Sequence, residues 1–401
     1  MKPYRLTEEE YNRILAFKRD LHMHPELSRQ EFQTTEKIRK FLMDLPDFEI
    51  LPLNTETKTG VAAKIRGCGG TGSEQRAREV LLRADIDALP QNEEFDSPWK
   101  SQNPGVMHAC GHDFHTAALL GAALLLQRAK DDGELHGTVD LLFQPAEEGT
   151  AGAHMVIESE LFERIRPDLC FGLHNWPSVQ TGKIACHEGP LMAGKRNFEI
   201  VIRGVGGHGA MPHLCADAIV CAAAVIQSLQ TVVSRNTAPL DSVLLTLGRI
   251  EGGVRENIIA DRVSILGTVR SLSDDALDRA ISRIETIVQK TAEAYECSSE
   301  ILWKERVRAV WNSPEMTALA RKCAAMTGCE VTDAPPSLAS EDFASYRQFA
   351  PSFFYWVGST ASGDIPVELH KPTFHTDDTA LRYAAELLAI SAMKGLEQQS
   401  D

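Results

Sequence analysis

The sequence predicts an α/β protein in which a separate α+β domain interrupts a mainly parallel sheet. Strands and helices alternate through the first half of the chain, which is typical of a parallel sheet flanked by helices. Near residue 193 the order changes to strand–helix–strand–strand–helix–strand, which indicates a ferredoxin-like unit. At 401 residues, the chain exceeds the length at which a single core usually stops growing, so two domains are expected.

The first half begins with helices and continues as alternating strands and helices. Thr7, followed three residues later by Glu10, forms a capping box that starts the first helix. This helix should end near His22, because Pro25 cannot continue it. The expected elements, in order, are helices over residues 7–22 and 32–45, strands over 61–65 and 80–84, a helix over 113–129, and strands over 139–143 and 169–173.

The inserted domain is expected over residues 193–307, between the two parts of the first domain, residues 1–192 and 308–401. Its pattern predicts strands over 198–202, 243–247, 263–269 and 300–305, and helices over 216–234 and 274–295. The first domain resumes with a helix over 314–326, an aromatic strand over 353–357 and a closing helix over 378–393. Ligands of parallel sheets gather beyond the carboxyl ends of the strands, so polar residues that follow strands are site candidates.

Composition excludes several classes of function. The 41 basic and 56 acidic side chains give a net charge of −15, which disfavours nucleic acids and anionic membrane surfaces as partners. The longest apolar run, residues 117–126, is shorter than the roughly 20 residues of a membrane span. The first ten residues lack the apolar core of a signal peptide, and the nine cysteines form no paired framework. These features predict a cytoplasmic protein.

The most informative stretch is residues 105–115, which holds one thiol and three imidazoles within eight residues. An apolar helix follows directly, so the cluster should be held rigidly at a loop-to-helix junction. Gly111 lets the backbone turn sharply and aim Cys110 and His112 at one point. A thiolate and an imidazole are ligands for zinc and its first-row neighbours. The alternative is a small buried thiol next to a histidine that only caps the helix.

Further candidates follow strands or lie in a late loop. Glu147 and Glu148 are adjacent at a strand end, so their side chains should point apart. One carboxylate can then bind metal while the other transfers a proton. His174 ends an apolar strand, and His370 lies in a loop. Taken singly, these residues also fit an acidic surface turn, a hydrogen-bonded core histidine and a surface histidine.

The order of these groups along the chain is more specific than any one of them. It resembles the amidohydrolases of the hippurate hydrolase, auxin-conjugate hydrolase and bacterial N-acyl amino acid deacetylase group. These enzymes belong to the aminoacylase and carboxypeptidase-like dinuclear metallopeptidases. The resemblance runs nearly end to end, and its motifs lie at residues 19–27, 83–90, 107–113, 145–149, 206–208, 340–343 and 369–372.

The resemblance implies a metallohydrolase catalytic domain with two divalent metal ions per subunit, drawn from zinc, manganese, cobalt and nickel. It implies five protein ligands: Cys110, His112, Glu148, His174 and His370. Cys110 would bridge the two ions as a thiolate, and Glu147 would be the general acid and base. The metal ligands come from both parts of the first domain, so that domain would carry the reaction.

The resemblance also gives the inserted domain a role as a lid and a dimerisation surface. His208 would stabilise the oxyanion and contact the substrate, often in the partner subunit, so a homodimer is expected. Asn257 would bind substrate, although Ala260 stands where the family usually has proline. His375 lies where the family more often has an acidic or apolar residue. We interpret His375 as a neutral surface residue, with competition for metal as the alternative.

The favoured reaction is metal-assisted hydrolysis of an N-acyl-L-amino acid, with an acetyl, benzoyl or related acyl group, to a carboxylic acid and a free amino acid. A metallo-dipeptidase fits the same residues. In a second hypothesis, Cys110 is the nucleophile of a thiol amidase, but this leaves Glu148, His174 and His370 without a role. A third, a non-catalytic binding or assembly protein, conflicts with the complete set of catalytic and ligand residue types.

Overall fold

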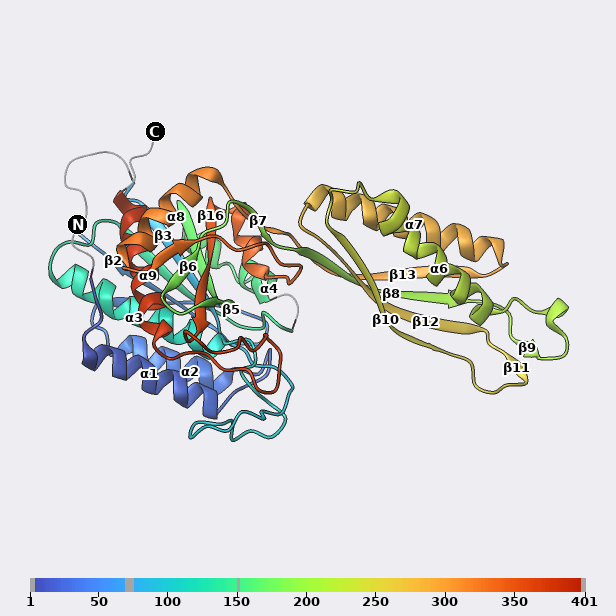
Figure 1. The fold of residues 1–401 in the computed structure, drawn as a ribbon, viewed down its shortest axis with the longest axis horizontal. Helices are drawn as coiled ribbons and strands as arrows, with labels where there is room; N and C mark the ends of the chain where they lie inside the picture. Colours follow the sequence, from blue (N-terminus) through green and yellow to red (C-terminus); the bar gives the residue numbers. More distant parts are fainter. Residues whose placement is uncertain (1–3, 69–75, 150–151, 398–401) are drawn as a thin grey trace. The chain divides into compact units, whose positions relative to one another are not determined.

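The computed structural model describes residues 4–68, 76–149 and 152–397. The chain folds into two compact units (Figure 1). Unit 1 comprises Met1–Gly189, Trp311–Pro335 and Ser345–Asp401, and unit 2 comprises Pro190–Val310 and Pro336–Ala344. The chain passes between the units at the short strands β7 (Gly189–Met192) and β14 (Val310–Asn312), and again on either side of Pro336–Ala344.

A mixed sheet with a parallel centre forms the middle of unit 1. Within the described residues its strand order is β1-β2-β4-β3-β5-β16-β6-β15. The central strands β3 (Glu79–Asp85), β4 (Thr138–Gln144), β5 (Leu169–Gln180) and β16 (Ser352–Thr360) run parallel. The outer strands are β1 (Phe48–Leu51), β2 (Val61–Arg66), β6 (Lys183–Ala185) and β15 (Glu330–Thr332). The predicted α/β class with a mainly parallel sheet is confirmed.

Helices pack with this sheet around one apolar core. They are α1 (Glu8–Met23), α2 (Phe32–Met43), α3 (His112–Asp131), α8 (Pro314–Met326) and α9 (Ala380–Glu397). The predicted capping box starts α1, with reciprocal hydrogen bonds between Thr7 and Glu10. Helix α3 packs against both α1 and α9, and nearly all of its residues are buried. The start of α3, which carries His112, is therefore held firmly. Two short helices, α4 (Gly152–Glu158) and α5 (Leu161–Arg164), follow β4.

Unit 2 has the ferredoxin-like order that the sequence predicts. Its elements are β8 (Gly194–Arg203), α6 (Ala218–Asn236), β10 (Val243–Gly252), β12 (Arg262–Ser271), α7 (Asp274–Ala294) and β13 (Ser298–Val307). The strands form an antiparallel sheet in the order β10-β12-β8-β13, and both helices pack against it around a second apolar core. A separate small ladder joins β9 (Gly207–His208) to β11 (Ile258–Ile259).

Helix α6 is apolar on two faces. Among the described residues it is the one helix whose length and mean hydropathy reach those of a membrane span, and about one third of that stretch is buried. Its buried residues follow helical spacing and belong to the unit 2 core: Ala218, Cys221, Ala222, Val225, Leu229 and Val232. Ile219, Val220 and Val233 are exposed on the same helix.

Some boundaries differ from those that the sequence predicts. Strand β5 continues to Gln180, so His174 lies inside the strand and not at its end. The reason is tertiary: β16 pairs with β5 beyond His174, through Asn175 and Trp176. The short strands β1, β6 and β15 were not predicted, because segments of three or four residues show too little periodicity to be recognised without their pairing partners.

Candidate metal centre

A thiol and two imidazoles from different elements converge in unit 1. Cys110 and His112 flank the start of α3, and His174 comes from β5. Each offers a ligand atom within 4.8 Å of the other two, and Sγ of Cys110 lies 3.3 Å from Nε2 of His174. All three residues are buried. A buried group of soft and imidazole donors is the kind of site that zinc and its neighbours occupy.

A second group shares the same thiol. Cys110, Glu148 and His370 also offer ligand atoms within 4.8 Å of one another, and Nε2 of His370 lies 2.8 Å from Oε1 of Glu148. His370 reaches this position through a left-handed backbone conformation, with φ of 62°. Its N–H donates to the carbonyl oxygen of Ala109, next to Cys110, at 2.8 Å. A cysteine that belongs to two sets of donors could serve two ions at once.

The donor chemistry fits divalent cations. The Nε2 atom of His112 is buried and has no hydrogen-bond partner among the described residues. Burial raises the pKa of the Cys110 thiol, and the nearby Glu148 carboxylate raises it further. A cation beside the sulfur would supply the positive charge that a buried thiolate lacks.

The Glu147-Glu148 pair sits on a turn held from two sides. Ala146, just before it, is fully buried with a left-handed φ of 57°, and its N–H donates to Oε1 of Glu31 at 2.8 Å. The backbone N–H groups of Glu147 and Glu148 donate to the two carboxylate oxygens of Asp87, at 3.1 Å and 3.0 Å. Burial, reinforced by the Asp87 charge, raises the pKa of Glu31 to about 7. Both carboxylates of the pair also come within 4.8 Å of a His112 ring nitrogen.

Gly111 is required where it stands. Its φ of 92° lies in the left-handed region, where side chains are disfavoured. A Cβ at this position would lie 2.0 Å from Oδ1 of Asn175. The glycine therefore does more than permit a turn, because it lets the backbone between two candidate ligands pack directly against β5.

Three further residues support the cluster, and the sequence predicted none of them as a metal ligand. Asp85, His115 and Asn175 are fully buried next to the cluster. The Nδ1 of His115 lies 2.6 Å from Oδ1 of Asp85, and the N–H of Asn175 donates to Nε2 of His115 at 2.9 Å. The spacing of His112 and His115, one helical turn apart, was visible in the sequence. The partners of His115, which lie 30 and 60 residues away, were not.

The other predicted site residues lie in unit 2. His208 is exposed, stands opposite Ile258 in the β9–β11 ladder, and accepts at Nδ1 from the N–H of Ala210. Asn257 lies beside it, with its carbonyl oxygen bonded to the N–H of Gly209 at 2.9 Å. The structure thus brings together the six predicted residues of unit 1, and separately places His208 next to Asn257.

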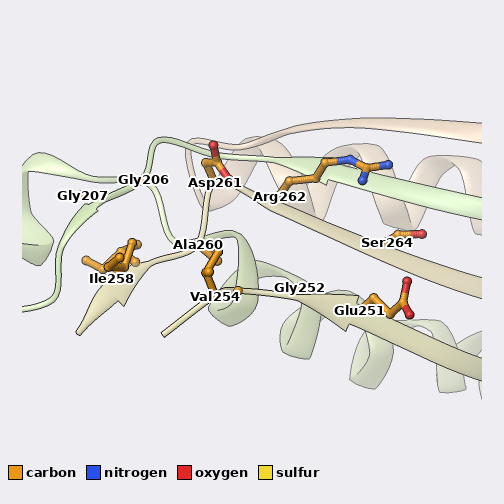
Figure 2. Close-up of a pocket in the computed structure, with 12 residues that line it drawn as sticks. Gly206, Gly207, Glu251, Gly252, Val254, Ile258, Ala260, Asp261, Arg262 and Ser264 are labelled. Carbon is orange, nitrogen blue, oxygen red and sulfur yellow. The ribbon is translucent and has the colours of Figure 1, made fainter. Parts of the chain in front are cut away.

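A cavity of about 590 Å³ adjoins the β9–β11 ladder (Figure 2). Gly206 and Gly207, which precede His208, form part of its wall, together with residues from the end of β10 and the start of β12. Figure 2 shows Arg262 and Glu251 among the charged side chains that border it. A Cβ would lie 2.9 Å from the carbonyl oxygen of Ile259 at Gly206 and 2.4 Å from Sγ of Cys215 at Gly207, so these glycines let neighbouring segments pack closely beside His208.

His375 lies apart from every candidate ligand group found among the described residues. Its ring stacks on Phe95, with centroids 4.1 Å apart and planes 9° apart, and its Nδ1 donates to the carbonyl oxygen of Thr373. The side chain is exposed. This environment agrees with the interpretation of His375 as a surface residue.

The sequence pattern of the family described as peptidase family M20/M25/M40 matches residues 81–394. The chain belongs to the M20/M25/M40 peptidase family. It is 40% identical to an N-acetyl-L-cysteine deacetylase of Bacillus subtilis (strain 168), over 97% of this chain and 89% of that protein. It is 36% identical to an N-acetyldiaminopimelate deacetylase of Geobacillus thermodenitrificans (strain NG80-2), over 95% of this chain and 98% of that protein.

Solved structures of this M20 family share the fold. A Bacillus subtilis protein, YXEP, described as a dinuclear metal binding peptidase from the M20 family, superposes with a TM-score of 0.82. It is 36% identical, over 98% of this chain and 99% of that one. The chain is therefore a metal-dependent amidohydrolase, and the broader group expected from the sequence is confirmed. The Bacillus and Geobacillus relatives are deacetylases of acetylated amino acids, not hippurate hydrolases.

Proposed function

We propose that this M20 hydrolase removes small acyl groups from N-acyl-L-amino acids, giving a carboxylic acid and a free amino acid. The observation that carries the proposal is the position of Cys110 in two ligand groups at once, beside the turn that presents Glu147. Relatives that deacetylate N-acetylcysteine and N-acetyldiaminopimelate support an acetyl group as the first candidate, with benzoyl and related groups as further ones. We place the enzyme in the cytoplasm.

The ligand set in this proposal is Cys110, His112, Glu148, His174 and His370, holding two divalent ions. When bound, such ions polarise an amide carbonyl and make water acidic enough to ionise near neutral pH. Zinc, manganese, cobalt and nickel all suit sulfur, imidazole and carboxylate donors, so the donor set alone does not select one metal.

Glu147 performs the proton transfers. Its carboxylate accepts a proton from the attacking water, the water oxygen bonds to the amide carbon, and Glu147 returns the proton to the leaving nitrogen as the C–N bond breaks. Asp87 accepts hydrogen bonds from the backbone N–H groups of both Glu147 and Glu148. The proton carrier and a metal ligand therefore keep a fixed position relative to each other. Burial of Glu147 among the other candidate groups limits competing water.

Unit 2 would supply the oxyanion donor and the contact between subunits of a homodimer. Strand β10 is an edge of its sheet, so its backbone is open on one side. Exposed apolar side chains lie on β10 and α6: Leu244, Ile250, Ile219, Val220 and Val233. An open strand edge beside an apolar helix face suits pairing with a second copy. In this proposal His208 donates to the oxyanion and Asn257 contacts the substrate, both in the partner's site.

A hydrolysis screen with metal added back tests the proposal. Enzyme stripped with a chelator and reloaded with one metal at a time is assayed on N-acetyl-, N-benzoyl- and indoleacetyl-amino acids and on dipeptides. We expect no activity in the stripped enzyme and recovery with at least one divalent metal, with N-acetyl-amino acids cleaved best. Preference for dipeptides would favour the metallo-dipeptidase instead. A stripped enzyme that stays active but is inactivated by a thiol alkylator would support the thiol amidase and refute the metal mechanism.

A further inference from the structure

A buried chain of hydrogen bonds runs from the interior of the unit 1 sheet to a candidate metal ligand. It begins at Arg83, whose Nη1 donates to Oδ2 of Asp85 at 2.7 Å. The other oxygen of Asp85 lies 2.6 Å from Nδ1 of His115. Arg83, Asp85 and His115 are at most 1% exposed. Water therefore does not compete for these bonds.

Both ring nitrogens of His115 are used, and their roles are fixed. Its Nε2 accepts the backbone N–H of Asn175 at 2.9 Å, so this nitrogen carries no proton. The proton of the neutral ring is then on Nδ1, where it is donated to Asp85. The last register pair between β3 and β5 joins Arg83 to Gly172. Beyond the end of that ladder, the imidazole of His115 takes the place of a strand partner for Asn175.

Asn175 also forms a hydrogen bond with the ring of His174. Nδ1 of His174 lies 2.6 Å from the carbonyl oxygen of Asn175, and a carbonyl can only accept, so Nδ1 carries the proton. The unprotonated Nε2 of His174 is the nitrogen that lies 3.3 Å from Sγ of Cys110. This tautomer is the one that leaves a lone pair for a metal ion.

We propose that His115 is a positioning residue for the metal centre. By holding the N–H of Asn175, it fixes the carbonyl group that sets the tautomer and ring orientation of His174. The inference rests on the proposed role of His174 as a ligand. His115 itself binds no metal in this proposal, because both of its ring nitrogens are already engaged. Loss of its contact with Asn175 should weaken the binding of one of the two ions.

Two substitutions separate the two bonds of His115. The amide of Gln reaches about as far as Nε2 of histidine, so His115→Gln can still accept from Asn175. The amide of Asn reaches about as far as Nδ1, so His115→Asn can still donate to Asp85 but cannot reach Asn175. His115→Leu removes both bonds while keeping an apolar side chain in the buried position. It provides the comparison if the Asn variant does not fold.

The measurement is metal affinity, not activity. Metal-free enzyme is titrated with cobalt(II) in competition with a chelator of known affinity, while the cobalt absorption spectrum is recorded. We expect His115→Asn and His115→Leu to bind one ion about 10- to 100-fold more weakly, as is typical when a contact that orients a ligating histidine is lost. His115→Gln should retain most of the affinity and the wild-type spectrum. Equal affinities in the Asn and Gln variants would overturn the proposal.

His108 offers a matched control. It is also buried, lies two residues from Cys110, and has no hydrogen-bond partner for either ring nitrogen among the described residues. His108→Asn should leave both affinities unchanged, and a loss as large as that of His115→Asn would assign the effect to general disturbance of the core. His174→Ala tests the underlying assignment separately. If His174→Ala still binds two ions, the proposed ligand set fails, whatever the His115 variants show.

Discussion

Nδ1 of His112 lies 3.2 Å from Oδ1 of Asp87, and the same oxygen accepts the backbone N–H of Glu147. One buried carboxylate therefore orients a candidate metal ligand and the turn that presents Glu147, the proposed proton carrier. The hydroxyl of Ser28 donates to the other oxygen of Asp87 at 2.6 Å, which fixes the carboxylate itself. With Nδ1 engaged by Asp87, His112 is left with Nε2 for a metal ion.

Glu147 and Glu148 should respond differently to the same substitution. Glu147→Gln keeps the size of the side chain but cannot take up a proton, so we expect kcat to fall by about 10²- to 10⁴-fold with metal content near that of the wild type. Glu148→Gln should instead lower the metal content, because an amide is a weaker ligand than a carboxylate. Metal analysis of both purified variants, together with their turnover, distinguishes the two roles. Equal metal loss in both variants would show that the division of labour is wrong.

Replacement of Gly111 by alanine should damage the site more than the backbone strain alone predicts. Gly111→Ala places Cβ against Asn175 at a left-handed position, so we expect loss of stability and of bound metal together. Gly133→Ala is the matched control, because Gly133 has a φ of 74° but open space around it. The control should lose only the roughly 1–2 kcal/mol that a left-handed conformation costs. Thermal unfolding and metal analysis of both variants test this prediction. Equal losses of stability and of metal in the two variants would show that the contact with Asn175 is not the reason for a glycine at position 111.

His208 should act on turnover without affecting the metal. His208→Ala removes an imidazole from the exposed end of unit 2, so we expect kcat to fall about 10²- to 10³-fold, as when an oxyanion donor is lost, with metal content unchanged. A histidine that only caps its turn, through the bond to the N–H of Ala210, would cost some stability and leave kcat unaltered.

Mixing variants tests whether His208 acts in the partner subunit. Inactive His208→Ala protein is combined with inactive Glu147→Gln protein, and subunit exchange is monitored with two tags. A hybrid dimer would contain one site with both residues intact, so activity should reappear. Exchange without recovery of activity would mean that His208 serves its own chain or has no catalytic role.

The stability of the chain should depend on pH through His22. Burial lowers the pKa of His22, but its contacts with Asp113 at 2.9 Å and Glu93 at 3.2 Å outweigh this and raise the pKa to about 9. The folded chain therefore binds this proton more tightly than the unfolded chain, whose pKa is about 6.5. The contribution is fully present below pH 6.5 and is lost as the pH rises to about 9.

The comparison for this effect is His22→Gln. The difference in unfolding free energy between wild type and variant should shrink as the pH rises from 6 to 9.5, by about 3 kcal/mol or less. Denaturant unfolding at each pH measures this difference in unfolding free energy. The proteins are kept metal-free so that metal binding does not contribute. A difference that stays constant across this range would contradict the assignment of the proton to His22.

Local chemistry made much of the fold and the candidate site predictable. The period of apolar residues predicted helix α8 at its observed bounds, Pro314–Met326, and the Thr7–Glu10 pair marked the start of α1. Residues 105–115 combine donor atoms, a glycine and an apolar helix within one short segment, so Cys110 and His112 stand out as candidates from neighbouring residues. That segment alone left a buried thiol and a capping histidine as the alternative, and the order of motifs along the whole chain favoured metal binding.

What the sequence could not predict depends on contacts between distant segments. The length of β5 follows from its pairing with β16, which begins more than 170 residues after β5. Asp85 and Asn175 lie 30 and 60 residues from His115 in the sequence, and only the folded chain brings them to the two sides of its ring. The left-handed conformation of Ala146 likewise could not be predicted from the sequence, because alanine rarely adopts it unless surrounding contacts impose it.

The main segment of unit 2 begins and ends on adjacent strands, since Lys195 near the start of β8 pairs with Val307 at the end of β13. Neighbouring strands lie about 4.8 Å apart, so the two ends of this long excursion are separated by little more than one residue's length. A segment anchored in this way behaves as a cassette. Changes in its length and loops, in evolution or by engineering, therefore need not alter the path of the chain that carries the candidate metal ligands, provided that its contacts with Pro336–Ala344 of the same unit are kept.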